Sequence, residues 1–296
     1  MQFGDLELHL ISDGLVWVDA GGPFGLVPRV LYEPYFQPDE NNQIPQCLTC
    51  MLIQSNGENI LVDTGLGPKL SEKERARWGL ERATGDLLEG LAGLGLGAED
   101  IDHVINTHLH WDHCGGNTAS VDEGVLARFP NATYWVQRTE WAEASHPDAR
   151  TRGTYFSENF TPIVRAGRFR LLAGDTQINR HLRCVVTPGH TRAHQSVLIS
   201  SGDWRGLFVA DMASYAINFA KTAWLPSYDV LPLENIKTKG RWQKWAVDHQ
   251  AWLFFQHDPF TPVGRLSSQD GKLKVEPVAE AEKLTDALPI PPRPGG

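Results

Sequence analysis

One ten-residue segment, Thr107 to Gly116, constrains this chain more than any other part of its 296 residues. Four side chains that bind metals fall within six positions, at the spacing H-x-H-x-D-H: His108, His110, Asp112 and His113. Neutral imidazole and carboxylate are ligands that Zn, Fe, Mn and Co accept. A polar loop with chance histidines is the alternative, but the density of this tetrad favours a metal site.

The residues around the tetrad indicate how it is presented. Val104 and Ile105, just before it, predict the end of a buried strand. Gly115 and Gly116, just after it, allow the backbone to bend tightly where a side chain would clash. A strand that ends in a bent loop can direct alternate side chains to one point.

Three later segments each offer one more ligand after an apolar run. They are His190 after residues 185–189, Asp211 after residues 206–210 and His257 after residues 252–256. Near the start of the chain, Leu61-Val62-Asp63-Thr64-Gly65 places another carboxylate after an apolar run.

As a set, these motifs resemble the metal-binding signature of the metallo-β-lactamase superfamily, and the resemblance covers residues 5–260. The order His, Asp, His of the later ligands is the one that this superfamily has. The resemblance implies an α/β fold, the αβ/βα four-layer sandwich, in which two mixed β-sheets pack together with helices outside. Its metals would lie at strand ends between the two sheets.

The resemblance also implies a ligand set for two divalent metal ions. One ion would be held by His108, His110 and His190 and the other by Asp112, His113 and His257, with Asp211 bridging both. Zinc is the first expectation, and Mn, Fe and Co suit the same ligands. Asp63 would fix the tautomer of a ligand histidine, and His194 is expected to support the site by hydrogen bonding rather than as a ligand.

An aspartate at position 211 favours hydrolases of this superfamily other than the β-lactamases, which commonly have Cys or Ser there, so β-lactamase activity would be at most weak. Two metals lower the pKa of bound water towards ~7. The resulting hydroxide would attack a small ester or lactone, as in the N-acyl homoserine lactonases, while Asp112 acts as a ligand and can relay a proton to the leaving group. A phosphotriesterase-like or phosphodiesterase-like hydrolase is the alternative. A non-catalytic metal-binding scaffold is a third.

Aromatic residues supply the remaining candidates. The homoserine lactonases have a catalytic tyrosine three positions after the bridging aspartate, where this chain has Ser214. Tyr215, one position later, is therefore the candidate oxyanion donor. Five residues are expected to wall an apolar substrate pocket, with core burial as the equal alternative: Phe24, Trp111, Phe219, Trp224 and Tyr228.

The charge and the apolar runs of the sequence limit the kinds of molecule that this protein can bind. Lys plus Arg number 27 against 36 Asp plus Glu, and the net charge of −9 disfavours nucleic acid. No apolar run reaches the 18 residues of a membrane span. The first five residues carry no basic and apolar signal pattern, so we expect a cytoplasmic protein with four reduced cysteines that acts on a small molecule.

The organisation follows from patterning. Residues 1–275 are expected to form one domain, with residues 20–46 as an inserted loop that serves as a lid or a homodimer contact, and residues 276–296 as a Pro-rich tail. Ser55-Asn56-Gly57 predicts a hairpin between two strands. Helices are expected over residues 68–82, 86–94 and 235–250.

Overall fold

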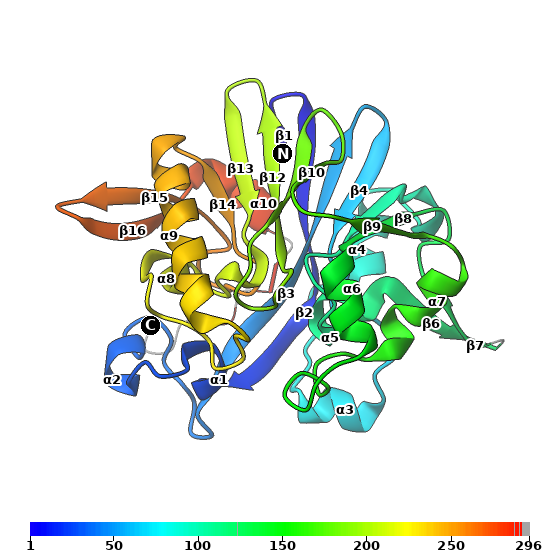
Figure 1. Cartoon of the computed structure of the whole chain (residues 1–296), viewed down its shortest axis with the longest axis horizontal. Helices are drawn as coiled ribbons and strands as arrows, with labels where there is room; N and C mark the ends of the chain where they lie inside the picture. Colours follow the sequence, from blue (N-terminus) through cyan, green and yellow to red (C-terminus); the bar gives the residue numbers. More distant parts are fainter. Residues whose placement is uncertain (123, 287, 290, 292–296) are drawn as a thin grey trace.

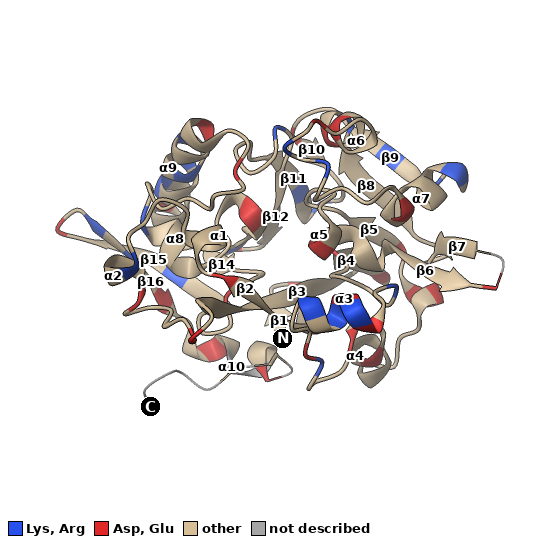
Figure 2. Ribbon diagram, turned by 90° about the horizontal axis from the view of Figure 1, so that it is seen from below, with Lys and Arg blue, Asp and Glu red and all other residues tan. Residues whose placement is uncertain are grey.

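The computed structural model describes residues 1–122, 124–286, 288–289 and 291 of the chain. Two seven-stranded sheets pack face to face, and helices cover their outer faces. Both views place α8 and α9 outside one sheet and α4, α6 and α7 outside the other (Figure 1, Figure 2). This is the four-layer sandwich that the resemblance predicted.

The first sheet has the order β1-β2-β3-β4-β5-β8-β9, antiparallel from β1 to β4 and parallel from β4 to β9. Its strands are β1 (Gln2–Phe3), β2 (Leu6–Asp19), β3 (Gln43–Ser55), β4 (Glu58–Val62), β5 (His103–Ile105), β8 (Thr133–Gln137) and β9 (Phe169–Leu172). A separate hairpin joins β6 (Thr118–Val121) to β7 (Gly124–Ala127).

The second sheet runs in the order β10 to β16, and only its β13–β14 pair is parallel. Its strands are β10 (Thr176–Gln177), β11 (Leu182–Val186), β12 (Gln195–Ser201), β13 (Trp204–Phe208), β14 (Trp252–Phe254), β15 (Val263–Gln269) and β16 (Lys272–Pro277).

The helices are short, apart from α9. They are α1 (Gly21–Phe24), α2 (Arg29–Tyr32), α3 (Glu72–Arg77), α4 (Leu87–Gly93), α5 (Trp111–Cys114), α6 (Arg138–Ser145), α7 (Thr161–Arg165), α8 (Ala216–Ala220), α9 (Pro232–Asp248) and α10 (Glu282–Thr285). Single 3₁₀ turns span Ala98–Asp100, Gly115–Asn117, Ser157–Asn159, Ala210–Met212 and Ala279–Ala281. Among the described residues, none of the helices has the length and apolar character needed to cross a membrane.

The core is built by the period-two alternation of strands that are buried on both faces. In β14, Trp252 and Phe254 point into the space between the sheets, whereas Leu253 points outward to α8 and α9. In β4, Ile60 and Val62 face the space between the sheets and Leu61 faces α4. The sheet faces are thus filled by apolar side chains, and polar chemistry is confined to the strand ends.

Several expected elements are present with shifted ends. The hairpin joins β3 to β4, and its turn residues Asn56 and Gly57 both have the positive φ that such a turn needs. The helix expected over residues 86–94 is α4, which Asp86 caps. The helix expected over residues 68–82 is shorter, because only α3 forms there and none of its side chains is buried.

Two expected boundaries differ from the structure. The predicted loop of residues 20–46 contains α1 and α2, and its last four residues belong to β3. The predicted tail begins inside β16, and its described part includes Val278, Ala281, Leu284 and Leu288, which pack in the core. These four side chains are apolar, and burying them against the sheets outweighs the Pro-rich character of the segment. Residues 287, 290 and 292–296 of the expected tail lie outside the described residues.

Candidate metal centre

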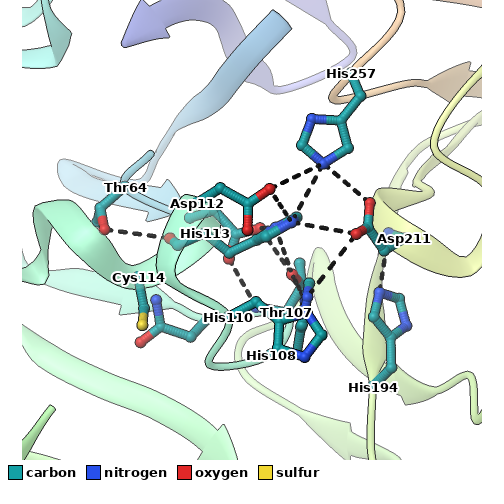
Figure 3. Close-up of polar contacts among 12 residues, drawn as sticks. Thr64, Thr107, His108, His110, Asp112, His113, Cys114, His194, Asp211 and His257 are labelled. Carbon is teal, nitrogen blue, oxygen red and sulfur yellow. Dashed lines mark hydrogen bonds and ion pairs between the residues drawn. The ribbon is translucent and has the colours of Figure 1, made fainter. Parts of the chain in front are cut away.

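All seven candidate ligands lie close together, and each comes from the segment that follows a strand. Figure 3 labels six of them, all except His190. Those from the first sheet follow β5, where His110 immediately precedes α5 and His113 lies within it. Those from the second sheet follow β11, β13 and β14. This arrangement is forced by topology, since strands of two packed sheets that end at the same edge bring their loops together.

The ligand atoms form three overlapping groups, and within each group they all lie within 4.8 Å of one another. The groups are His108–His110–His190, His108–His113–Asp211 and Asp112–His113–His257. Asp112 is half-buried, and the other six residues are buried. The sets that the resemblance implied for the two ions are therefore brought together, with Asp211 between them.

The Asp211 carboxylate faces both sets at once. Its Oδ2 atom lies 3.1 Å from His190 Nε2 and 3.4 Å from His113 Nε2, and its Oδ1 atom lies 3.0 Å from His257 Nε2. Asp211 stands in a 3₁₀ turn directly after Ala210, whose φ is +48°. This left-handed residue turns the chain at the end of β13 and carries the carboxylate inward.

Asp63 orients the first-sheet ligands. Its carboxylate accepts hydrogen bonds from the Thr107 amide at 2.8 Å and the Thr107 hydroxyl at 2.7 Å, and it lies 2.9 Å from His113 Nδ1. Because a carboxylate only accepts, His113 donates from Nδ1 and keeps a lone pair on Nε2. Having donated to Asp63, the Thr107 hydroxyl is left to accept from His108 Nδ1 at 3.1 Å.

The second-sheet ligands are oriented in the same way by different partners. His190 Nδ1 lies 3.1 Å from Asp229 Oδ1, and His257 Nδ1 donates to the Cys47 carbonyl at 2.7 Å. The Nε2 atoms of both histidines therefore carry lone pairs. Asp229 was not among the residues predicted from the sequence. It stands 39 residues after His190 in the loop before α9, and no motif marks it.

Each of these Nε2 atoms lies close to a ring nitrogen of a ligand that follows the first sheet. His190 Nε2 lies 3.0 Å from His110 Nδ1, and His257 Nε2 lies 3.2 Å from His113 Nε2. Buried atoms without a hydrogen-bond partner among the described residues include His108 Nε2 and Asp211 Oδ1. Nitrogens around a tetrahedral zinc at ~2.0–2.1 Å lie about 3.3–3.4 Å apart, so the spacing fits shared cations. The residues present fit divalent metal ions.

Protons and metals compete for the same atoms. Burial lowers the pKa of His108 and His110, and their histidine neighbours lower it further. Burial alone would also lower the pKa of His113 and His190, but nearby carboxylates, Asp211 among them, raise both above the usual value. Neutral imidazole, the form that binds metal, is thus already favoured at His108 and His110.

His194 has both ring nitrogens occupied. Nδ1 lies 2.8 Å from the Thr187 hydroxyl, and Nε2 accepts from the Asp211 amide at 3.0 Å. It has no free atom for a metal, and its bond to Asp211 fixes the backbone of the bridging residue. His194 therefore contacts the site as a hydrogen-bonding residue and not as a ligand.

Gly115 and Gly116 have a different role from the predicted bend. Neither has a left-handed φ, and their Cα atoms instead lie against the Thr64–Leu66 backbone. A Cβ on Gly116 would lie 2.1 Å from the Thr64 carbonyl oxygen. The two glycines let α5 approach the end of β4, where Asp63 stands.

Comparison with known proteins agrees with this geometry. The family model of the metallo-β-lactamase superfamily matches residues 49–257. The chain belongs to this superfamily. Its ligand set and its membership together make it a metal-dependent hydrolase.

Individual relatives are more distant. The N-acyl homoserine lactonase AttM of Rhizobium radiobacter is 27% identical over 221 residues, which cover 70% of this chain and 80% of that protein. A probable metal-dependent hydrolase from Staphylococcus aureus superposes with a TM-score of 0.85 at 28% identity, over 94% of this chain and 99% of that one. The dizinc quorum-quenching lactonase AidC has a TM-score of 0.77 over 94% and 96%, and at 22% identity it shows the fold alone.

A pocket of about 400 Å³ opens onto this cluster of candidate metal ligands. Its floor includes His110, Asp112, His190 and Asp211. Among its walls are Trp17, Trp78, Trp111, Gly22 and Tyr228. Trp111 and Tyr228 were expected there; Trp17 and Trp78 were not, because they lie on β2 and directly after α3, far from any ligand in sequence. The Trp78 and Trp111 rings pack with centroids 4.3 Å apart.

The expectation that Tyr215 reaches the metals is wrong. Its ring is buried against Phe36, with centroids 4.3 Å apart, and its hydroxyl donates to the Pro45 carbonyl at 3.4 Å. Ser214, one position earlier, is the residue that lines the pocket. Tyr215 therefore belongs to the aromatic cluster with Phe24 and Phe36 and does not line the pocket.

Three expected pocket residues also lie elsewhere. Phe24 is buried in the aromatic cluster around Tyr215. Phe219 is buried against Phe255 under α9. Trp224 does not line the metal pocket. It lines a second groove together with Gly25 and Leu26. For Phe24 and Phe219 the alternative of core burial is the correct one, whereas Trp224 is half-buried at the edge of that second groove.

Proposed function

We propose that this protein is a lactonase that opens the ring of N-acyl homoserine lactones by adding water, with two zinc ions held by the seven converging side chains. The observation that carries the proposal is the Asp211 carboxylate, which faces histidines of both ligand sets at the floor of an aromatic-walled pocket. The names of relatives such as AttM support the choice of substrate.

When bound, a pair of divalent metals supplies water of lowered pKa and polarises the carbonyl under attack. The protein residues hold that pair rigidly. Asp63 and Asp229 fix the tautomers of His113 and His190, so that each Nε2 atom stays free for a metal. Asp112, half-buried and lining the pocket, is the carboxylate placed to pass a proton to the leaving alkoxide.

The walls of the pocket suit an acyl chain. Trp17, Trp78 and Trp111 offer flat apolar surface, and binding pockets for small molecules are lined mainly in this way. A volume of about 400 Å³ is at the small end of the range for ligand pockets. The pocket therefore favours a small substrate with a short apolar chain.

The experiment is a substrate panel on one metal-loaded preparation: an N-acyl homoserine lactone, an aryl ester, a phosphotriester, a phosphodiester and a β-lactam. We expect the lactone to give the largest kcat/KM, the β-lactam almost none, and chelation to abolish the lactone activity until zinc is restored. Faster phosphotriester or phosphodiester hydrolysis would favour the alternative function. Full metal content without turnover of any member would favour a scaffold.

Other expectations stay predictions. Leu26, Val30 and Leu31, in and beside α2, are exposed apolar residues that support a homodimer contact in this segment. A cytoplasmic location rests on the sequence alone. Sedimentation of the purified protein tests the dimer.

A further inference from the structure

Among the residues that the structure describes, Tyr228 is the one tyrosine in the walls of the metal pocket. It lies in the loop between α8 and α9, next to Asp229, which orients His190. The edge of its ring meets the His190 ring, with centroids 6.2 Å apart and planes at 86°. From the sequence, Tyr228 was expected only as part of the pocket wall.

The hydroxyl end of Tyr228 points inward although 37% of the residue is exposed. A Cβ added to Gly22 of α1 would lie 2.6 Å from Tyr228 Oη, so the hydroxyl rests directly against the Gly22 backbone. Both residues line the pocket together with Asp112 and Asp211. Among the described residues, none forms a hydrogen bond with this hydroxyl.

We propose that Tyr228 takes the part expected of Tyr215: its phenol O–H donates a hydrogen bond to the substrate carbonyl oxygen as negative charge builds up there. The inference rests on the proposed lactonase function. A free donor beside the reacting centre is what oxyanion stabilisation requires. A phenol carries its proton at neutral pH and so remains a hydrogen-bond donor there.

The step balances without a change at Tyr228. A bond forms between the water oxygen and the carbonyl carbon, and the ring C–O bond breaks. One proton of the water ends on the leaving alkoxide, and the other leaves with the new carboxyl group. Tyr228 keeps its proton throughout and contributes only the hydrogen bond. It is thus a catalytic residue that touches substrate and holds no metal.

Three variants test the proposal. Tyr228→Phe removes the hydroxyl and keeps the ring, and Tyr215→Phe is the matched control because its hydroxyl lies outside the pocket. Gly22→Ala keeps the hydroxyl but displaces it, because the new methyl group would occupy its place, and the ring can swing outward. Gly22 does not have a left-handed φ, so the backbone accepts alanine.

We expect Tyr228→Phe to lower kcat about 100-fold with KM little changed and metal content intact. Tyr215→Phe should stay near the wild type. Gly22→Ala should lose a similar factor, and the double variant Gly22→Ala/Tyr228→Phe should be no worse than Tyr228→Phe alone. Calorimetric titration with the ring-opened N-acyl homoserine should show about five- to tenfold weaker binding to Tyr228→Phe.

An unchanged kcat in Tyr228→Phe, or an equal loss in Tyr215→Phe, would overturn the role of Tyr228. If the wild type hydrolyses only another member of the panel, the lactonase function fails. The same variants are then compared on that substrate, where an unchanged kcat again refutes Tyr228 as the donor.

Discussion

Replacing Asp63 with asparagine tests how the metal centre is held together. The Asp63 carboxylate is fully buried and has three close donors, two from Thr107 and one from His113. In Asp63→Asn, the side-chain oxygen of the asparagine can still accept a hydrogen bond from the Thr107 backbone N–H. The side-chain nitrogen then takes the place of Oδ2. There its N–H groups face the Thr107 hydroxyl and His113 Nδ1, which are themselves hydrogen-bond donors.

His113 can relieve this conflict only by moving its proton to Nε2, the atom that faces Asp211 and His257. That tautomer has no lone pair for a metal. Loss of such an orienting partner costs about 10- to 100-fold in metal affinity, or about 1.4 to 2.8 kcal/mol. Because His113 belongs to the set with Asp112 and His257, the metal in that set should be the one weakened.

The assay is a competition titration of zinc against a chromophoric chelator, with wild type, Asp63→Asn and Asp102→Asn compared. Asp102 precedes β5 at the end away from the ligands, is exposed, and accepts from the Asn59 amide at 2.8 Å. We expect one of two sites to weaken in Asp63→Asn and neither in Asp102→Asn. Equal zinc affinity at both sites in Asp63→Asn would refute the reasoning.

Three further predictions follow from contacts around the site. Gly116→Ala should lower the free energy of unfolding by about 2–3 kcal/mol, measured by denaturant titration, because its methyl group would meet the Thr64 carbonyl. Asp229→Asn should lower the zinc affinity less than tenfold. The side-chain oxygen of the new asparagine can still face His190, and Asn235 can flip so that its unpaired Oδ1 accepts from the new side-chain nitrogen. A loss as large as that of Asp63→Asn would contradict this. Burial lowers the pKa of Lys239 to about 7, so the unfolded chain binds more protons above pH 7. Stability should therefore rise from pH 7 to pH 9 relative to Lys239→Met, and parallel pH profiles would count against it.

The ligands were predictable because each follows an apolar run that only a buried strand explains. His190, Asp211 and His257 are far apart in sequence, yet each follows closely after a strand of the same sheet. A pattern of strand ends was therefore enough to mark them. The order of the motifs then identified the fold.

The supporting residues were not predictable in the same way. Asp229 and the Cys47 carbonyl orient ligands, but one lies in an irregular loop and the other is a backbone group without a side-chain signature. Tyr215 and Tyr228 show the limit most clearly. A shift of one residue in a loop directs one tyrosine into an aromatic cluster, and the loop packed against Gly22 brings the other into the pocket.

The central claim is that seven side chains form a centre for two metals. Anomalous diffraction at the zinc absorption edge, from crystals of the zinc-loaded protein, tests it most directly. We predict two peaks about 3.5–4 Å apart, one beside His108, His110 and His190 and the other beside Asp112, His113 and His257, with Asp211 between them. A single peak, or peaks outside this cluster, would contradict the account.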